Sequence, residues 1–280
     1  MAAQVSSKPL DLTIAIPVKN AEGHLEECLN AIPDGLAQRI ILIDSGSTDN
    51  TVKIARDYGV EVIEFHWDGR FPKKRNWFLR NHPPATRWVL FLDDDEILTP
   101  SFCDELFSKL PGSTKSGFWL NYTIYYLGKP LRWGYPLKKL ALFRVGEGEY
   151  ERIEEERWSH LDMEVHEHPV IKGALGKIHA RIDHRETKTE KEDAARHAEY
   201  AAWEAARIKA SDKDTANRQR WTWKQRLKRS IVTSSFAGLL YFVGSFLFMG
   251  GFLDGMRGVR FARKKAIYFS LIYHHIKKEA

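Results

Sequence analysis

The amino-acid sequence predicts an α/β protein with a central, mostly parallel sheet and helices on both of its faces. Four short apolar, β-prone runs lie within the first hundred residues, and segments with helical spacing separate them. Polar side chains follow directly after the second and fourth runs. Such an alternation of strands and helices is typical of a parallel sheet that helices cover on both sides.

The predicted strands occupy residues 12–18, 39–43, 60–65 and 88–92, and the predicted helices between them occupy residues 21–31, 50–58 and 73–81. In sheets of this kind a ligand binds beyond the carboxyl ends of the strands. The polar residues after the second and fourth strands therefore lie where a ligand is expected.

After residue 110 the pattern changes, with strands predicted at 117–126, at 140–144 and within 170–184, and a polar, Ala-rich helix at 189–209. A chain of 280 residues with 43% hydrophobic content can form one core of roughly 200–250 residues plus an appendage. We therefore assign residues 1–217 to one domain, with halves of about 10–110 and 111–217, and residues 218–280 to a helical appendage.

The formal net charge of +6 is unevenly distributed along the chain. Residues 218–280 contain 13 Lys and Arg and 2 acidic residues, a net +11, which leaves −5 for residues 1–217. Basic residues interleaved with aromatic and apolar ones are typical of contact with an anionic membrane surface. Nucleic acid is the competing partner, but this segment is too apolar for a tail that tracks phosphates, and we expect none.

Residues 230–253 form a run of 24 residues without a charge, and about 20 apolar residues suffice to span a bilayer. Gly and Ser interrupt this run, however, and basic residues flank both of its ends. A span normally carries positive charge mainly on its cytoplasmic side. We therefore favour a re-entrant or interfacial segment, with a true span and a buried helix as the alternatives.

The chain has two cysteines, Cys28 and Cys103, and neither belongs to a C-x-x-C pair. We therefore expect two reduced thiols in a cytosolic setting, with no disulfide framework or zinc knuckle. The first ten residues contain no apolar run, so no secretory signal is expected there.

The strongest chemical signal is Leu-Phe-Leu-Asp-Asp-Asp-Glu-Ile-Leu at 90–98. A buried strand delivers Asp93, Asp94 and Asp95, and then Glu96, into a loop. Desolvating like charges together is costly unless a cation neutralises them, and carboxylate oxygens suit Mg²⁺ or Mn²⁺. Asp93 and Asp95 should share one side of the strand end, with Asp94 turned away. The alternative is a solvated acidic turn that caps the next helix.

A second signal is Ile-Asp-Ser-Gly-Ser-Thr-Asp-Asn-Thr at 43–51. Asp44 can accept a hydrogen bond from a base or a ribose, and the hydroxyl of Ser45 can hydrogen-bond a nucleotide. The purely structural alternative is a strand–turn–helix that Asp49 or Asn50 caps.

These two motifs and Ala-Ile-Pro-Val-Lys-Asn at 15–20 together resemble family 2 inverting glycosyltransferases, which have the Rossmann-like GT-A fold. The resemblance implies that Asp44 contacts the uracil or ribose of a UDP-sugar and that Asp93 and Asp95 form a D-x-D pair, with Asp95 closest to a Mn²⁺ or Mg²⁺ ion. Residues 10–110 become the donor half and residues 111–217 the acceptor half. The implied nucleotide-sugar contacts are Pro17, Asn20, Asp44, Ser45, Arg75, Asp93 and Asp94.

Further segments extend the resemblance over nearly the whole chain. Phe-Pro-Lys-Lys-Arg-Asn-Trp at 71–77 makes Arg75, and then Lys74, candidates for the diphosphate, with a plain basic helix face as the alternative. Four later motifs, at 126–134, 142–144, 165–167 and 251–255, are similar to those of lipopolysaccharide core glucosyltransferases. Trp133 and Tyr135 could stack on a sugar ring or belong to the core.

An inverting transfer needs a base for the acceptor hydroxyl. The candidates are Asp162, Glu164 and Glu167, and we favour Glu167 because it stands in the Val-His-Glu motif of the resembling subset. His166 is a candidate third metal ligand. A surface carboxylate and a structural histidine are the respective alternatives.

The resemblance therefore predicts transfer of a hexose, glucose in the first instance, from a UDP-sugar to a lipid-linked or envelope glycan such as lipopolysaccharide core. The expected place is the cytoplasmic face of the inner membrane. A polyprenyl-phosphate acceptor and a non-catalytic scaffold are the alternatives. A sugar nucleotidyltransferase is disfavoured because no Gly-rich phosphate loop follows the first strand.

Overall fold

A computed structural model describes residues 8–153, 162, 168–185, 190–213 and 222–278 of the chain. The chain forms two compact units. Within the described residues, unit 1 comprises 8–125, 136–153, 162 and 168–185, and unit 2 comprises 126–135, 190–213 and 222–278.

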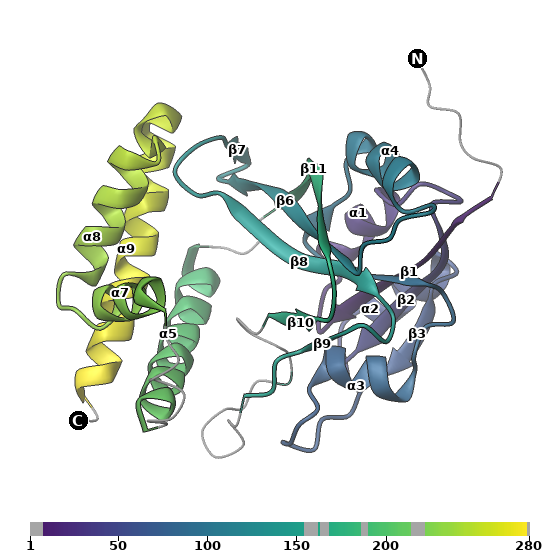
Figure 1. Cartoon of the computed structure of the whole chain (residues 1–280), viewed down its shortest axis with the longest axis horizontal. Coiled ribbons are helices and arrows are strands. Elements are labelled where there is room, and N and C mark those ends of the chain that lie inside the picture. Colours follow the sequence, from purple (N-terminus) through teal and green to yellow (C-terminus); the bar gives the residue numbers. More distant parts are fainter. Residues whose placement is uncertain (1–7, 154–161, 163–167, 186–189, 214–221, 279–280) are drawn as a thin grey trace. The chain divides into compact units, whose positions relative to one another are not determined.

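Unit 1 is built on one large sheet with the strand order β3-β2-β1-β4-β8-β6-β11-β5 (Figure 1). The strands are β1 (Leu10–Val18), β2 (Ala37–Asp44), β3 (Glu61–Glu64), β4 (Trp88–Phe91), β5 (Glu96–Ile97), β6 (Gly117–Tyr126), β8 (Leu137–Arg144) and β11 (Leu175–Arg185). A separate antiparallel pair joins β9 (Gly148–Tyr150) to β10 (Pro169–Ile171).

The predicted parallel pairing is found for the first four strands in sequence, and the rest of the sheet is mixed. Strands β3, β2, β1 and β4 are parallel neighbours. Strand β8 then runs antiparallel to both β4 and β6, and β5 runs antiparallel to β11. The sheet is therefore mixed, because β8 and β5 run opposite to their neighbours, whereas β11 runs parallel to β6.

The helices of unit 1 are α1 (Leu25–Asn30), α2 (Thr51–Asp57), α3 (Lys74–Asn81) and α4 (Pro100–Lys109). The chain moves outward along the sheet through α1 and α2 and returns through α3 to β4. Because crossovers between parallel strands are right-handed, α1 and α2 share one face and α3 takes the other. Figure 1 shows α1 and α3 on opposite sides of the sheet.

The core of unit 1 is formed mainly by the central strands. All four residues of β4 are buried, and Ile14 and Ile16 of β1 are fully buried beside them. Cys28 and Cys103 are free thiols, and both are buried. Continuous apolar runs of this kind are typical of strands that are covered on both faces.

Unit 2 contains a short strand and a set of helices. These are β7 (Lys129–Leu131), α5 (Glu190–Lys213), α7 (Trp223–Val232), α8 (Ala237–Val243), the π-helical turn η1 (Gly244–Phe248), the 3₁₀ turn η2 (Gly251–Asp254) and α9 (Gly255–Lys278). Helices α5 and α9 share a core of Ala201, Ala205, Ile208, Tyr268 and Ile272. The expected domain boundary at 217/218 differs from this division, because α5 and residues 126–135 pack with the C-terminal helices.

The uncharged run 230–253 is divided among α7, α8, η1 and η2. Within the described part of the chain, no single helix is long and apolar enough to cross a bilayer. Residues Arg226–Val232 and Ala237–Phe248 meet that criterion only as a pair, and the pair is bent by 111°.

Close backbone packing holds the turn before α9. A Cβ atom on Gly258 would lie 1.8 Å from the carbonyl oxygen of Gly251, and one on Gly134 would lie 2.9 Å from the Cα of Gly251. The Asp254 carboxylate accepts hydrogen bonds from the backbone N–H groups of Arg132 and Trp133. The motifs at 126–134 and 251–255 therefore form one packed joint within unit 2.

This packing predicts different effects of adding a methyl group at two helical glycines. Gly258→Ala should lower the free energy of unfolding by about 1–3 kcal/mol, because the Gly251 backbone has no room to move away. Gly244→Ala, where no atom lies within 4 Å of the added Cβ, should be neutral or stabilising by up to about 1 kcal/mol. Urea denaturation measures both, and equal effects would contradict the packing described.

Candidate functional site

The acidic loop lies at the carboxyl edge of the parallel half of the sheet. It follows β4, which is the parallel neighbour of β1. The backbone N–H of Leu92 donates to the carbonyl of Ala15 at 3.0 Å, so the pairing continues to the start of the loop. Four carboxylates therefore follow one another at the edge where ligands bind in such sheets.

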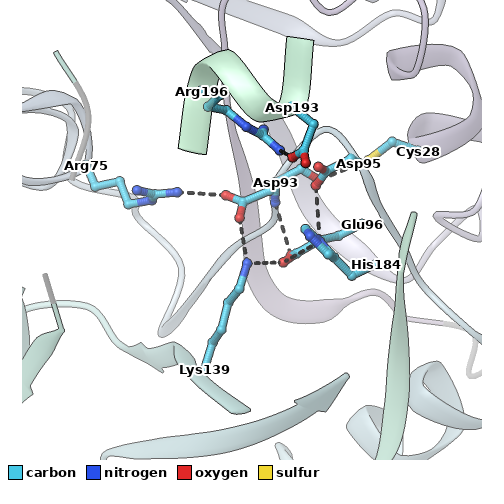
Figure 2. A network of polar contacts seen from close by, with 9 residues as sticks. All are labelled: Cys28, Arg75, Asp93, Asp95, Glu96, Lys139, His184, Asp193 and Arg196. Carbon is cyan, nitrogen blue, oxygen red and sulfur yellow. Dashed lines mark hydrogen bonds and ion pairs between the residues drawn. The ribbon is translucent and has the colours of Figure 1, made fainter. Parts of the chain in front are cut away.

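Asp93 binds a cation with each of its carboxylate oxygens (Figure 2). Arg75 Nη2 donates to Oδ1 and Lys139 Nζ donates to Oδ2, each at 2.7 Å. Arg75 comes from the first turn of α3, and Lys139 comes from β8. Burial opposes ionisation of Asp93, but Lys139 and Arg75 outweigh it and lower the pKa of this carboxyl group.

Glu96 is a buried member of the site and not the first-turn residue of the next helix. It lies in β5, and Thr99 caps α4 instead by accepting from Phe102 N–H. Its side chain is 1% exposed. The carboxylate accepts hydrogen bonds from Lys139 Nζ at 2.5 Å and from Asp93 N–H at 3.1 Å. Burial raises the pKa of Glu96 to about 7, although Lys139 acts against the shift.

Asp95 faces His184, which comes from β11. Asp95 Oδ1 and His184 Nδ1 lie 3.3 Å apart, and neither atom has a well-directed hydrogen-bond partner among the described residues. Burial acts to lower the pKa of His184, but the Asp95 carboxylate outweighs it and raises this pKa. A buried carboxylate oxygen and an imidazole nitrogen that face each other fit the ligands of Mn²⁺.

Within the described ranges, no three His, Cys, Asp or Glu side chains are already arranged as a metal site. The donors that fit a divalent ion are Asp95 and His184, because both oxygens of Asp93 are bound to cations of the chain. Mg²⁺ and Mn²⁺ are commonly bound by one or two protein ligands together with substrate phosphates, so an incomplete protein set is compatible with this chemistry.

The loop after β2 is held by its own hydrogen bonds. The Asp44 carboxylate accepts from Gly46 N–H at 3.1 Å, from Ser47 N–H at 3.0 Å and from Ser47 Oγ at 2.5 Å. Ser45 Oγ is buried without a hydrogen-bond partner in the described structure. Asp44 therefore fixes the loop that was expected to contact the nucleotide, and the Ser45 hydroxyl is the group in it with hydrogen-bonding capacity to spare.

Asn20 links the end of β1 to this loop. Its backbone adopts a φ of 54°, its Oδ1 accepts from Thr48 N–H at 2.9 Å, and its own N–H donates to Ser47 Oγ at 2.8 Å. A positive φ is uncommon for residues other than Gly, and Asn is among those that tolerate it best. Pro17 lies in β1 opposite Ile43 of β2, so both predicted residues stand at the same edge as Asp44.

The remaining predicted residues are distributed as follows. Asp94 lies half-buried in the acidic loop, and Lys74 is buried with Nζ donating to the Val18 carbonyl at 3.0 Å. Asp162 Oδ2 lies 3.7 Å from Lys74 Nζ. The predicted base Glu167, its alternative Glu164 and the predicted metal ligand His166 lie outside the described residues.

Trp133 and Tyr135 belong to unit 2, where Trp133 is 52% exposed and Tyr135 packs edge-on against Phe261.

Sequence reasoning missed Lys139 entirely and did not assign Glu96 or His184 to the site. Lys139 and His184 are single residues in strands that pair with distant parts of the chain, and no local motif marks them. For His184 the one available signal is that it belongs to a loose group of histidines in the sequence, with His166, His168 and His179. Only the pairing of β4 with β8 and of β5 with β11 brings these side chains to the acidic loop.

Comparison with known proteins gives one match to a family model, which covers residues 13–165 and is described as Glycosyl transferase family 2. An uncharacterized glycosyltransferase of Rickettsia typhi is 32% identical over 91 residues, which are 32% of this chain and 30% of that protein. One of Mycoplasma genitalium is 28% identical over 100 residues, 32% of this chain and 34% of that protein. The matched region thus spans about a third of the length of these curated relatives.

Among solved structures, glucosyl-3-phosphoglycerate synthase from Mycobacterium tuberculosis, in complex with Mn²⁺, uridine diphosphate and glucosyl-3-phosphoglycerate, is 26% identical. The match covers 42% of this chain and 44% of that one, with a TM-score of 0.33. S. aureus TarS is 20% identical over 40% of this chain and 22% of that one, with a TM-score of 0.34.

The geometry of Asn20 predicts an order of stability for two variants. Asn20→Gly should lower the free energy of unfolding by about 1 kcal/mol, because it removes the bond to Thr48 but tolerates the positive φ. Asn20→Ala should cost about 1–2 kcal/mol more, because it also forces a Cβ into the left-handed region. Chemical denaturation tests this order, and an Ala variant as stable as the Gly variant would refute the assigned role of the backbone conformation.

Proposed function

Because the chain belongs to glycosyl transferase family 2 and is therefore a glycosyltransferase, we propose that it transfers a hexose from a UDP-sugar to a lipid-linked or envelope glycan, with Mn²⁺ or Mg²⁺ as cofactor. The observation that carries the proposal is the group of Asp93, Asp95 and Glu96 at the carboxyl edge of the sheet. Carboxylates buried together in this way can bind a divalent cation, and the bound cation can in turn bind a diphosphate.

In this proposal Asp95 and His184 hold the metal ion, and the loop of Asp44 and Ser45 receives the nucleoside. A bound Mn²⁺ or Mg²⁺ supplies positive charge that stabilises the departing nucleoside diphosphate. Arg75 and Lys139 keep Asp93 ionised and oriented next to that position. The support is that Asp95 Oδ1 and His184 Nδ1 face each other at 3.3 Å, and that neither atom has a well-directed hydrogen-bond partner among the described residues.

The finer parts of the proposal rest on the motifs of the sequence. Glucose as the sugar, inversion at its anomeric carbon and lipopolysaccharide core as the acceptor follow from the resemblance of 126–134, 165–167 and 251–255 to core glucosyltransferases. Glu167 is the proposed base, which deprotonates the acceptor hydroxyl on the face opposite the leaving nucleotide.

We also propose that unit 2 binds an anionic membrane surface, at the cytoplasmic face of the inner membrane. Among the described residues, 15 of the 18 exposed large hydrophobic side chains belong to unit 2. Phe248 is 85% exposed, and Leu253 and Met256 are more than half exposed nearby in the chain. Exposed apolar groups within a segment of net charge +11 fit insertion into the headgroup region of one leaflet.

The part of the proposal that concerns the sugar donor predicts metal-dependent release of UDP. With a panel of UDP-, GDP- and dTDP-hexoses and an envelope glycolipid extract as acceptor, one UDP-hexose should be consumed in Mn²⁺ or Mg²⁺ and spared in EDTA. Asp95→Asn should lower turnover at least 100-fold, because it removes a charged ligand from the metal. Asp57→Asn, an exposed acidic residue at the end of α2, serves as the control and should leave turnover unchanged.

Two outcomes would redirect this proposal. Full turnover of Asp95→Asn would overturn the metal assignment. Full turnover of Glu167→Gln, with Asp162→Asn and Glu164→Gln also fully active, would argue against a base-assisted transfer and favour a polyprenyl-phosphate acceptor, which is already ionised.

The proposed contact of unit 2 with a membrane predicts cosedimentation with vesicles that contain about 30% phosphatidylglycerol. Cosedimentation with vesicles of phosphatidylcholine alone should be much weaker. Raising the salt concentration should weaken binding, because the basic residues contribute electrostatically. The double variant Phe248→Ser/Leu253→Ser should reduce binding at least tenfold, since it removes two exposed apolar groups. Val170→Ser changes an apolar residue of unit 1 that is 64% exposed and should bind like the wild type. Equal loss in both variants would refute the proposed surface.

A further inference from the structure

We propose that Lys139 is a positioning residue that weakens metal binding to the donor-free site, so that the divalent ion is held tightly only together with the nucleotide diphosphate. The inference deepens the proposed function, because it concerns the same acidic loop. Its basis is the position of the Lys139 ammonium group between two carboxylates that a metal ion could otherwise use (Figure 2).

The ammonium group of Lys139 is closely bound. Nζ lies 2.7 Å from Asp93 Oδ2 and 2.5 Å from Glu96 Oε1, and it stands 5.1 Å from the centre of the Tyr122 ring. The side chain is 31% exposed, so the group is reachable from solvent and yet paired on its carboxylate side. A cation of the chain therefore already occupies the space between Asp93 and Glu96.

The charges around the loop are unequally balanced. Asp93 is paired with two permanent cations, Lys139 and Arg75. Asp95 instead faces an imidazole, whose charge is lost when the nitrogen serves as a ligand. A divalent ion that approaches the loop would meet the carboxylate of Asp95, which faces an imidazole, and that of Asp93, which is paired with two cations.

This balance has a direct consequence for metal affinity. The ammonium group repels a second cation and removes Asp93 Oδ2 and Glu96 Oε1 from the set of available ligands. The two phosphates of a donor would supply the missing negative charge and oxygen ligands. Metal and donor should then bind with positive coupling, which is a free energy shared between the two ligands.

A plain structural ion pair predicts a different result. If Lys139 only stabilises the fold, its removal lowers the free energy of unfolding and leaves or weakens the affinity for metal. If it opposes the metal, its removal raises that affinity. The direction of the change in metal affinity therefore separates the two roles.

The experiment uses the full chain and Mn²⁺ alone, without nucleotide, with affinity measured by electron paramagnetic resonance of free Mn²⁺. Removing Lys139 from the wild type would also leave the buried carboxyl group of Glu96 without its cation, a second change that would obscure the effect on the metal. The comparison is therefore made between Glu96→Gln and Glu96→Gln/Lys139→Met. In the double variant Asp93 keeps its ion pair with Arg75.

The double variant should bind Mn²⁺ at least tenfold more tightly than Glu96→Gln, a difference of about 1.4 kcal/mol. Lys139→Arg should bind Mn²⁺ within about threefold of the wild type, since it keeps the cation. Lys138→Met, which changes the exposed neighbour on the same strand, should also bind like the wild type. Melting curves confirm that each variant is folded.

Equal or weaker Mn²⁺ binding by the double variant would overturn the inference, as would a failure of every variant to bind Mn²⁺. A second readout is the ratio of Mn²⁺ dissociation constants without and with UDP, which should fall when Lys139 is replaced. Tighter Mn²⁺ binding combined with no effect of UDP would show that Lys139 opposes the metal but would contradict both its coupling to a diphosphate and the proposed donor, so the two failures are distinguishable.

Discussion

The structure of unit 1 depends on how the chain compensates a row of carboxylates at the end of a fully buried strand. Burying several negative charges together is unfavourable unless cations accompany them. The compensating groups come from three separate elements: Arg75 from α3, Lys139 from β8 and His184 from β11. The mixed half of the sheet therefore does more than enlarge the core, because it delivers two of these three groups to the acidic loop.

Local sequence patterns predicted the parallel half of the fold well. The apolar runs correspond to β1, β2, β3 and β4, and the acidic loop and the loop of Asp44 lie at the expected edge. Such features depend on neighbours in sequence, which are visible in one chain. The antiparallel pairing of β8 with β4 and β6 depends on contacts between distant segments, so the prediction of a mostly parallel sheet failed there.

The same distinction applies to individual residues. Asp93 and Asp95 could be identified because they form a motif on one strand end. Lys139 stands in a strand with a second lysine beside it, and nothing in Lys138-Lys139 says which of the two faces the site. Asp44 was predicted to contact the nucleotide because its carboxylate can accept hydrogen bonds. The same carboxylate also stabilises its own turn, because the short loop offers few other acceptors to the N–H groups of Gly46 and Ser47. The close packing of Gly134 against Gly251 in unit 2 likewise depends on segments that are distant in sequence.

The alternation of side chains along β8 links the accuracy of folding to the chemistry of the site. In the observed register Arg144 pairs with Trp88 and Leu142 with Leu90, and continuing this pairing places Lys139 opposite Asp93. A slip of one residue would turn Lys139 to the other face of the sheet. A molecule misfolded in this way would retain an apolar core of similar composition while lacking its counter-charge. A purified preparation with normal secondary structure can therefore contain a fraction of inactive molecules. Its specific activity would measure the share of molecules in which β8 has the correct register.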